Sequence, residues 1–189
     1  SEQRGDTLQL GVDKPNGPLG GEVDMTVEVP DAVWESIRAT LSSGDVTIQD
    51  VNSARIDVVT SSGDIVLRRT SAGQIEFKTS SGDIEVDEFQ ADRVQFVTGS
   101  GDVELRNGEA VIAGKTGSGE IHIEVDELLR DTELTTGSGD VVVSLGRKPE
   151  SLAVDFQAGS GDAVIDWEGL MYETRSKDRD RIRGSFGRG

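Results

Sequence analysis

Apolar and polar residues alternate with a period of two in short segments that recur along most of this 189-residue chain. Each segment follows a Ser-Gly-acid triplet, and the first and third residues after the acid are apolar. These apolar pairs are Val46/Ile48, Ile65/Leu67, Ile84/Val86, Val103/Leu105, Ile121/Ile123, Val141/Val143 and Ala163/Ile165. The alternation predicts half-buried β-strands that point every second side chain into a core.

A second apolar column precedes the triplets. Seven residues before each triplet glycine stand Ile37, Ile56, Ile75, Val94, Ile112, Thr132 and Val154. Two residues further on are Ala39, Val58, Phe77, Phe96, Gly114, Leu134 and Phe156. This pattern predicts a second inward-facing strand, so each repeat contains at least two strands joined at the Ser-Gly-acid corner.

The repeats are almost evenly spaced. The triplet glycines are Gly44, Gly63, Gly82, Gly101, Gly119, Gly139 and Gly161, in steps of 19, 19, 19, 18, 20 and 22 residues. A fixed period near twenty residues is typical of a solenoid, in which each repeat buries its core against its neighbours. We therefore predict an all-β solenoid of about seven coils of ~19 residues, with strands ~4.8 Å apart. Residues 23–173 form this domain, after a lead-in at 1–22 and before a charged, Gly-rich, flexible tail at 174–189.

The composition of the chain argues against several classes of partner and site. The formal charge of −17 disfavours nucleic acid and anionic lipid as partners. The chain has no Cys, which excludes disulfides and thiolate metal sites. No apolar run reaches the ~18 residues of a membrane span, so we expect membrane attachment only through an anchor outside this chain.

The acids of the triplets are expected to stack along one edge of the solenoid as an acidic ladder. Its members are Asp45, Asp64, Asp83, Asp102, Glu120, Asp140 and Asp162. Like charges at this spacing repel by roughly 1 kcal/mol per pair in water. Turn hydrogen bonds or a bound cation could offset the repulsion; calcium suits such oxygen ligands. We favour turn chemistry, because Asp after Gly commonly caps a tight turn.

Carboxylate pairs on neighbouring rungs are candidates for the two catalytic acids of a glycoside hydrolase. The strongest pair is Glu85 with Glu104, at about the ~5 Å separation of a retaining glycosidase. Asp57 with Glu76 and Glu133 with Asp155 repeat the arrangement. However, flat solenoid faces lack the cleft that raises a carboxylate pKa, and the chain has a single histidine. We therefore expect no enzymatic activity and no catalytic residues.

One outward column carries apolar residues near the end of the solenoid. His122, Val142 and Val164 are expected side by side, either as a partner-binding patch or covered by the following Trp167–Tyr172 segment. That segment and Trp34 are also candidates for capping the two ends of the solenoid. The alternating residues Val23, Met25, Val27 and Val29 are further candidates at the N-terminal end.

The segments Thr60–Ile65, Thr79–Ile84 and Thr136–Val141 resemble an adhesin-like family of bacterial and archaeal β-strand-repeat proteins of unknown function, related to the heads of autotransporter adhesins. The resemblance covers roughly 23–165. It implies a right-handed β-helix, often attached to a membrane anchor, with no catalytic residues. Family members commonly continue from a Gly-x-Gly step into a last coil. Residues 184–189 resemble that step, which implies a further coil or an edge open to a partner.

From these observations we expect a non-enzymatic display and binding module at the cell envelope, outside the cytoplasm. Its partner is a protein or glycan at the cell surface. The alternative is a structural scaffold that self-associates through its coil edges. A polysaccharide-acting β-helix enzyme is the third hypothesis. No cofactor is expected, with calcium on the acidic ladder as the open alternative.

Overall fold

The computed structural model describes residues 2–4, 7–9, 32–128, 132–147, 152–167, 170–173 and 181–186. The chain divides into two compact units, Ser1–Pro30 and Asp31–Gly189. In the first unit, β1 (Glu2–Arg4) and β2 (Thr7–Gln9) form an antiparallel pair. The alternating residues 23–29, candidates for capping the N-terminal end, lie outside the described residues. The described part of the second unit is a β-solenoid without helices, as the sequence predicted.

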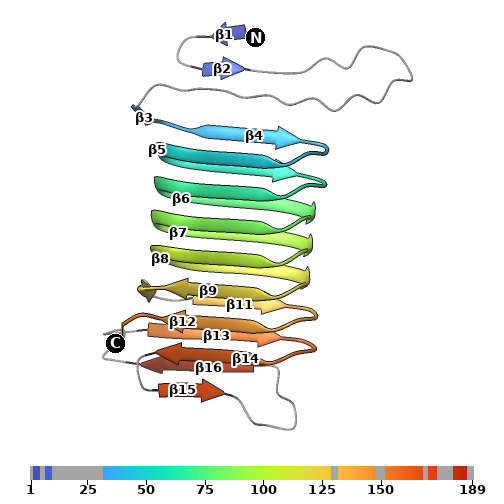
Figure 1. Ribbon diagram of the computed structural model, residues 1–189, viewed down its shortest axis with the longest axis vertical. Helices are drawn as coiled ribbons and strands as arrows, with labels where there is room; N and C mark the ends of the chain where they lie inside the picture. Colours follow the sequence, from blue (N-terminus) through green and yellow to red (C-terminus); the bar gives the residue numbers. More distant parts are fainter. Residues whose placement is uncertain are drawn as a thin grey trace, which may run out of the picture. The chain divides into compact units, whose positions relative to one another are not determined.

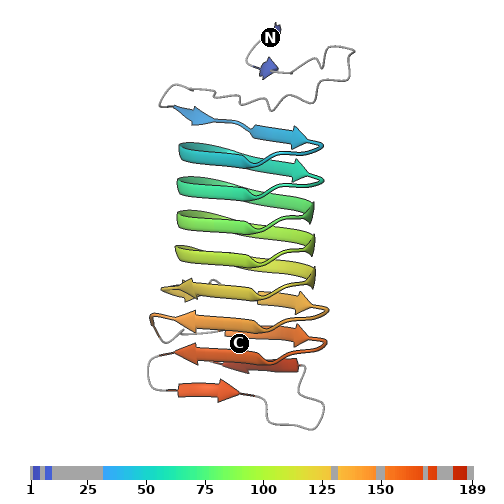
Figure 2. The same ribbon diagram turned by 45° about the vertical axis from the view of Figure 1, so that its right-hand side comes forward.

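The coils of the second unit stack with their strands parallel and in register (Figures 1 and 2). The first coil contains β3 (Val33–Trp34) and β4 (Ile37–Leu41), both paired with β5. Four long strands then each follow one whole coil: β5 (Val46–Thr60), β6 (Ile65–Ser81), β7 (Ile84–Ser100) and β8 (Val103–Ser118). Later coils consist of shorter strands: β9 (Ile121–Val125), β10 (Glu127–Leu128), β11 (Thr132–Thr136), β12 (Val141–Leu145), β13 (Leu152–Ala158) and β14 (Ala163–Trp167).

Each long strand bends twice, so the coil has three sides. In β5, residues 46–49, 51–53 and 55–59 pair with β6, whereas Asp50 and Ala54 at the bends do not. We call these the first side, the short side and the second side, and use the same names in every coil. Asp50 and its equivalents Arg69, Glu88 and Asn107 adopt positive φ between 48° and 57°. The alternating strands predicted the first and second sides, whereas the short side between them was not predicted.

The core runs through the stack as columns of one residue per coil. On the first side Ile65, Ile84, Val103 and Ile121 are at most 1% exposed. On the second side Phe77 and Phe96 are equally buried. The ring of Phe96 lies over Gly114 so closely that a Cβ there would be 2.0 Å from its Cζ. The missing side chain at Gly114 therefore leaves room for the ring of Phe96 in the core.

The Ser-Gly-acid corners join the second side of one coil to the first side of the next, on the right-hand edge of Figure 1. All seven triplet glycines have positive φ, from 114° to 157°. From Gly63 onward each also lies against the carbonyl oxygen of the preceding triplet glycine, which a Cβ would approach to 2.1–2.3 Å. Both conformation and close approach therefore require glycine.

Two antiparallel strands terminate the described C-terminal end of the stack. β15 (Leu170–Glu173) pairs with β14, and β16 (Arg181–Phe186) pairs with β13. The tail predicted to be flexible thus contains a strand, because Ile182 is buried in the core at 3% exposure. The Gly-rich step expected to lead into another coil lies partly in this strand. One expectation was that the Trp167–Tyr172 segment folds over the outward face of the first side. β15 instead pairs with β14 and continues the sheet of that side.

Candidate functional site

The acidic ladder is held by its own turn hydrogen bonds. Each of four aspartates accepts, at Oδ1, a hydrogen bond of 2.8–2.9 Å from the backbone N–H of the acid one coil later. These are Asp45, Asp64, Asp83 and Asp102. Asp140 accepts the same bond from the N–H of Asp162 at 2.8 Å. The carboxylates therefore act as inter-coil turn caps, which is the chemistry that the sequence analysis favoured.

Glu120 interrupts this pattern. Among the described residues its carboxylate makes no hydrogen bond to the backbone N–H of Asp140. Its Oε1 instead lies 4.0 Å from Nδ1 of His122, since the longer side chain reaches the first side. In the described part of the chain, no group of three or more His, Asp or Glu residues is arranged to hold a metal ion.

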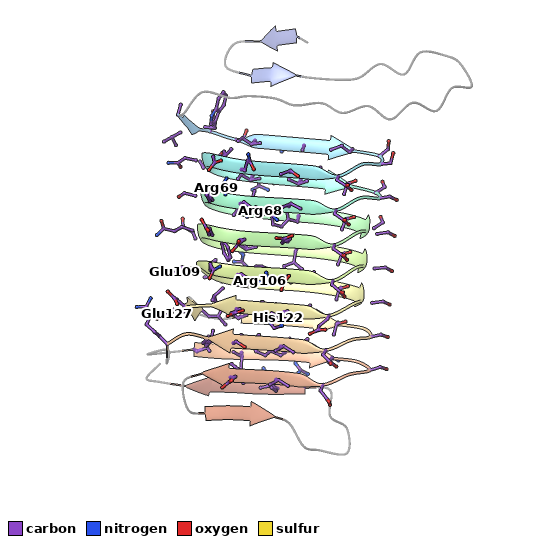
Figure 3. The ribbon with its side chains drawn as sticks, viewed as in Figure 1. Arg68, Arg69, Arg106, Glu109, His122 and Glu127 are labelled. Carbon is purple, nitrogen blue, oxygen red and sulfur yellow. The ribbon has the colours of Figure 1, made fainter. Side chains whose placement is uncertain are left out.

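The carboxylates proposed as a glycosidase pair lie on the first side, and each is bound to an arginine. Glu85 and Glu104 are direct register partners on β7 and β8. Arg68 donates a 2.9 Å hydrogen bond to Glu85, and Arg106 donates one to Glu104. Arg68, Arg106 and His122 are labelled along this side in Figure 3. Each carboxylate of this pair is therefore engaged in an ion pair with an arginine of its own face.

The apolar column near the end of the first side is assembled as expected. Val142 is the register partner of both His122 and Val164. Both valines are half-buried, and the His122 side chain is 37% exposed. Glu173 of β15 pairs with Val164 at the edge of the sheet. The three residues thus form a small mixed surface.

The second side carries a network of ion pairs near the N-terminal end of the stack. Asp57, only 8% exposed, receives hydrogen bonds from Arg55 at 2.9 Å and from Arg38 at 3.0 Å. Arg55 also binds Glu76 at 2.8 Å. Hydrogen bonding by Arg55, and then by Arg38, lowers the pKa of Asp57. The remaining predicted pair, Glu133 with Asp155, is in register on β11 and β13.

Asp155 has cationic partners from the terminal strand. Arg181 of β16 binds its carboxylate through Nε at 2.7 Å and through Nη2 at 2.5 Å. This hydrogen bonding lowers the pKa of Asp155. Antiparallel backbone pairing and this ion pair together attach β16 to β13.

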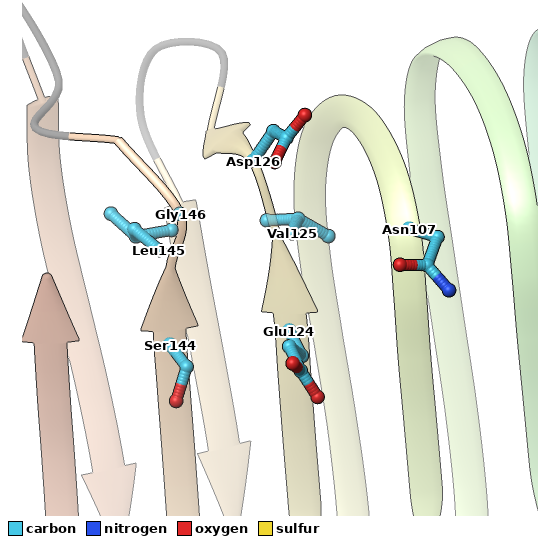
Figure 4. Close-up of a pocket in the computed structure, with 7 residues that line it drawn as sticks. All are labelled: Asn107, Glu124, Val125, Asp126, Ser144, Leu145 and Gly146. Atoms are coloured by element: carbon cyan, nitrogen blue, oxygen red, sulfur yellow. The ribbon is translucent and has the colours of Figure 1, made fainter.

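Two open hollows lie on the surface of the residues that the structure describes. The larger, of about 330 Å³, forms where the coils lose their positive-φ bend (Figure 4). Its lining is Asn107, Glu124, Val125, Asp126, Ser144, Leu145 and Gly146. Val125 and Leu145 are buried beneath a polar rim. The other, of about 300 Å³, lies on the short side around Ser71, Gln90 and Glu109. Neither encloses a group of acid and base residues.

The short side and both hollows were not predicted from the sequence. The sequence does contain a signal for the short side, a column of small residues at the repeat spacing. These residues are Ser53, Ala72, Ala91 and Ala110. All four are buried. The hollow of Figure 4 has no such signal, since it forms where the later coils lengthen and the period is lost.

In-register coils, parallel pairing and outward columns define a β-solenoid repeat protein. The chain matches the Toastrack DUF4097 family over residues 1–187, and it belongs to that family, a domain of unknown function. No curated protein and no solved structure matches the chain. The predicted membership of a β-repeat family of unknown function is therefore confirmed at that level, and the adhesin relation stays a prediction. No helix in the described residues is long and apolar enough to cross a membrane.

Proposed function

We propose that the protein is a non-enzymatic, adhesin-like display and binding module of the cell envelope. The observation that carries the proposal is the register of the coils. From β5 to β8, residues of successive coils pair one to one along the first and second sides, interrupted only by a shift near Gln90. Outward side chains therefore stand in columns at a rung spacing of ~4.8 Å. Such a surface suits recognition of an extended protein or glycan partner.

The ion pairs made by the outward carboxylates support a non-enzymatic role. Glu85 and Glu104 face arginines, and hydrogen bonds from Arg55 and Arg38 lower the pKa of Asp57. Acid catalysis needs a carboxyl group whose pKa is raised by burial or by a neighbouring anion. The arginines around Asp57 create the opposite environment. The envelope location is proposed from the resemblance to adhesin-like proteins.

The scaffold alternative requires coil edges that pair from one molecule to the next. The described C-terminal edge ends in β15, of four residues, and β16, which carries Arg181 and Arg183. Short and charged edge strands disfavour edge-to-edge pairing. This closure favours display over end-to-end assembly.

Two measurements test the proposal. Sedimentation velocity over a wide concentration range, with calcium and again with a chelator, is expected to give a monomer throughout. The same protein on beads is then screened against a glycan array and a displayed peptide library, and retention of one ligand class is expected. Assemblies that keep growing as the protein concentration rises would favour the scaffold alternative over the display module. Retention of no ligand at all would refute a binding module.

A further inference from the structure

Arg93 and Lys115 are exposed cations that stand apart from the others in the described chain. Every other Lys or Arg whose side chain is described forms an ion pair. Arg93 and Lys115 form none within the described residues, although the chain carries a formal charge of −17. Both lie on the second side, on the neighbouring strands β7 and β8. An acidic protein that leaves two cations on neighbouring strands unpaired offers them to an external anion.

The second side of β7 and β8 carries no carboxylate within residues 93–97 and 111–115. Asp92 and Glu109 lie next to it, at the bend and on the short side. The outward residues of the second side are Arg93, Gln95 and Val97 on β7, and Val111, Ala113 and Lys115 on β8. Register pairs Arg93 with Val111, Gln95 with Ala113, and Val97 with Lys115. We call these six residues the central patch. In the column of Gln95 and Ala113, the next residues on either side are acidic: Glu76 on the preceding coil and Glu133 on the following coil.

The central patch is also apolar. Val97 is 48% exposed, and Val59, two coils earlier in the same column, is 39% exposed. Together with Val33 they are the exposed large hydrophobic residues of the described chain. Ala113 lies between Val111 and Lys115 and is the smallest side chain of its column. The patch thus has cations at opposite corners and an apolar centre where the short side chain of Ala113 leaves a shallow depression.

We propose that the central patch binds an extended segment of a partner protein in which acidic residues at positions i and i+4 flank an apolar residue at i+2. The inference rests on the proposed function, because it names the partner class of that binding module. Arg93 and Lys115 are separated by four residues along the strand and by one rung, about 14 Å between Cα atoms. In an extended peptide, residues i and i+4 lie ~13 Å apart on one face, with i+2 between them. The two carboxylates can reach both cations while the apolar side chain covers Ala113.

The chemistry of the patch favours a peptide over an acidic glycan. Val97, Val111 and Ala113 bury apolar surface against an apolar side chain, which a polyanionic sugar chain does not supply. The patch also lacks aromatic side chains. We therefore treat an anionic glycan as a competing outcome of the test.

The experiment measures binding of full-length protein to immobilised synthetic peptides. The matched peptide contains Glu-Thr-Val-Thr-Glu between threonines. The control peptide has the same composition with its two glutamates adjacent, so that they face opposite sides. The test variant is Arg93→Glu/Lys115→Glu. The control variant Arg147→Glu/Arg183→Glu makes the same charge change at side chains that are 67% and 77% exposed and only loosely paired, at 3.7 and 3.8 Å. Polygalacturonate is the anionic-glycan probe.

We expect the wild type and the control variant to bind the matched peptide equally, and the test variant to bind it roughly tenfold more weakly or worse, because two exposed ion pairs become repulsive. Added salt should weaken the wild-type complex. Equal binding of both peptides, or undiminished binding by the test variant, overturns the proposal. Loss of polygalacturonate binding in the test variant without any peptide binding overturns it in favour of a glycan. If the array or library retains a ligand that the test variant still binds, the proposed function stands and the central patch fails.

Discussion

Replacing Gly101 by alanine should cost much more stability than the same replacement at Gly44. Gly101 has a φ of 142°, and a Cβ there would lie 2.1 Å from the carbonyl oxygen of Gly82. Ordinary contact begins at 3.4 Å, so the two coils must separate by 3.4 − 2.1 = 1.3 Å. That displacement breaks the bond from Gly82 N–H to the Ser100 carbonyl at 3.0 Å and the bond from Asp102 N–H to Asp83 at 2.8 Å.

The magnitude follows from these two contributions. Unfavourable φ costs about 1–3 kcal/mol, and each lost hydrogen bond about 1 kcal/mol. Gly101→Ala should therefore lower the free energy of unfolding by about 3–5 kcal/mol, against about 5–15 kcal/mol for a typical domain. Gly44 has a φ of 114°, but its added Cβ would meet only Leu41 Cδ2, at 3.8 Å. Gly44→Ala should cost only the conformational part.

Urea unfolding followed by far-UV circular dichroism measures both values on equal terms. The comparison removes the conformational cost, because both positions have positive φ. A difference between the two variants below about 0.5 kcal/mol, within the usual scatter of additive mutations, would refute the role assigned to glycine stacking.

Three further changes probe the ladder, the core and the ion-pair network. Glu120→Asp should stabilise the protein by about 0.5–1 kcal/mol in urea unfolding by supplying the missing bond to the Asp140 N–H; no gain would contradict the capping geometry. Thr132→Val should raise stability by about 1 kcal/mol, because the buried Thr132 hydroxyl has no hydrogen-bond partner among the described residues; a loss would show that it has one. Asp57→Asn should destabilise at neutral pH. Since the folded pKa of Asp57 is lowered, its contribution is present above the unfolded pKa of about 3.9 and is lost as pH falls through the folded value. The stability gap between wild type and variant, measured by urea unfolding at several pH values, should therefore close in acid; a constant gap would contradict this.

The fold could be predicted because its determinants are local and repeated. Each coil has the same Gly corner and the same alternating strand after it, as at Ile65–Leu67 and Ile84–Val86, so seven weak signals reinforce one another. The ladder could be foreseen as turn chemistry for the same reason. The short side was missed because it spans only three residues, as at 51–53, which is too short to show an alternating pattern. Only its third position, Ser53 and its equivalents in β6 to β8, is small and buried in each of these coils.

The ends and the electrostatics were harder to predict. β16 pairs antiparallel with β13, and no repeat marks it. Its burial depends on Ile182 in an otherwise charged segment. The isolation of Arg93 and Lys115 is also invisible in sequence, because which arginine pairs with which acid depends on side-chain geometry across three coils. The β16 strand and the unpaired cations both occur where the chain departs from its repeat.

The ladder bonds join residues one repeat apart, for example Asp64 to Asp45 and Asp83 to Asp64, each over 19 positions. Excising a complete 19-residue unit, such as residues 64–82, would bring identical corner chemistry together and leave every column continuous. The height of the solenoid is therefore a heritable variable that gene duplication or deletion can change in steps of ~4.8 Å. Lineages of such chains could adjust how far a binding surface projects without redesigning its core.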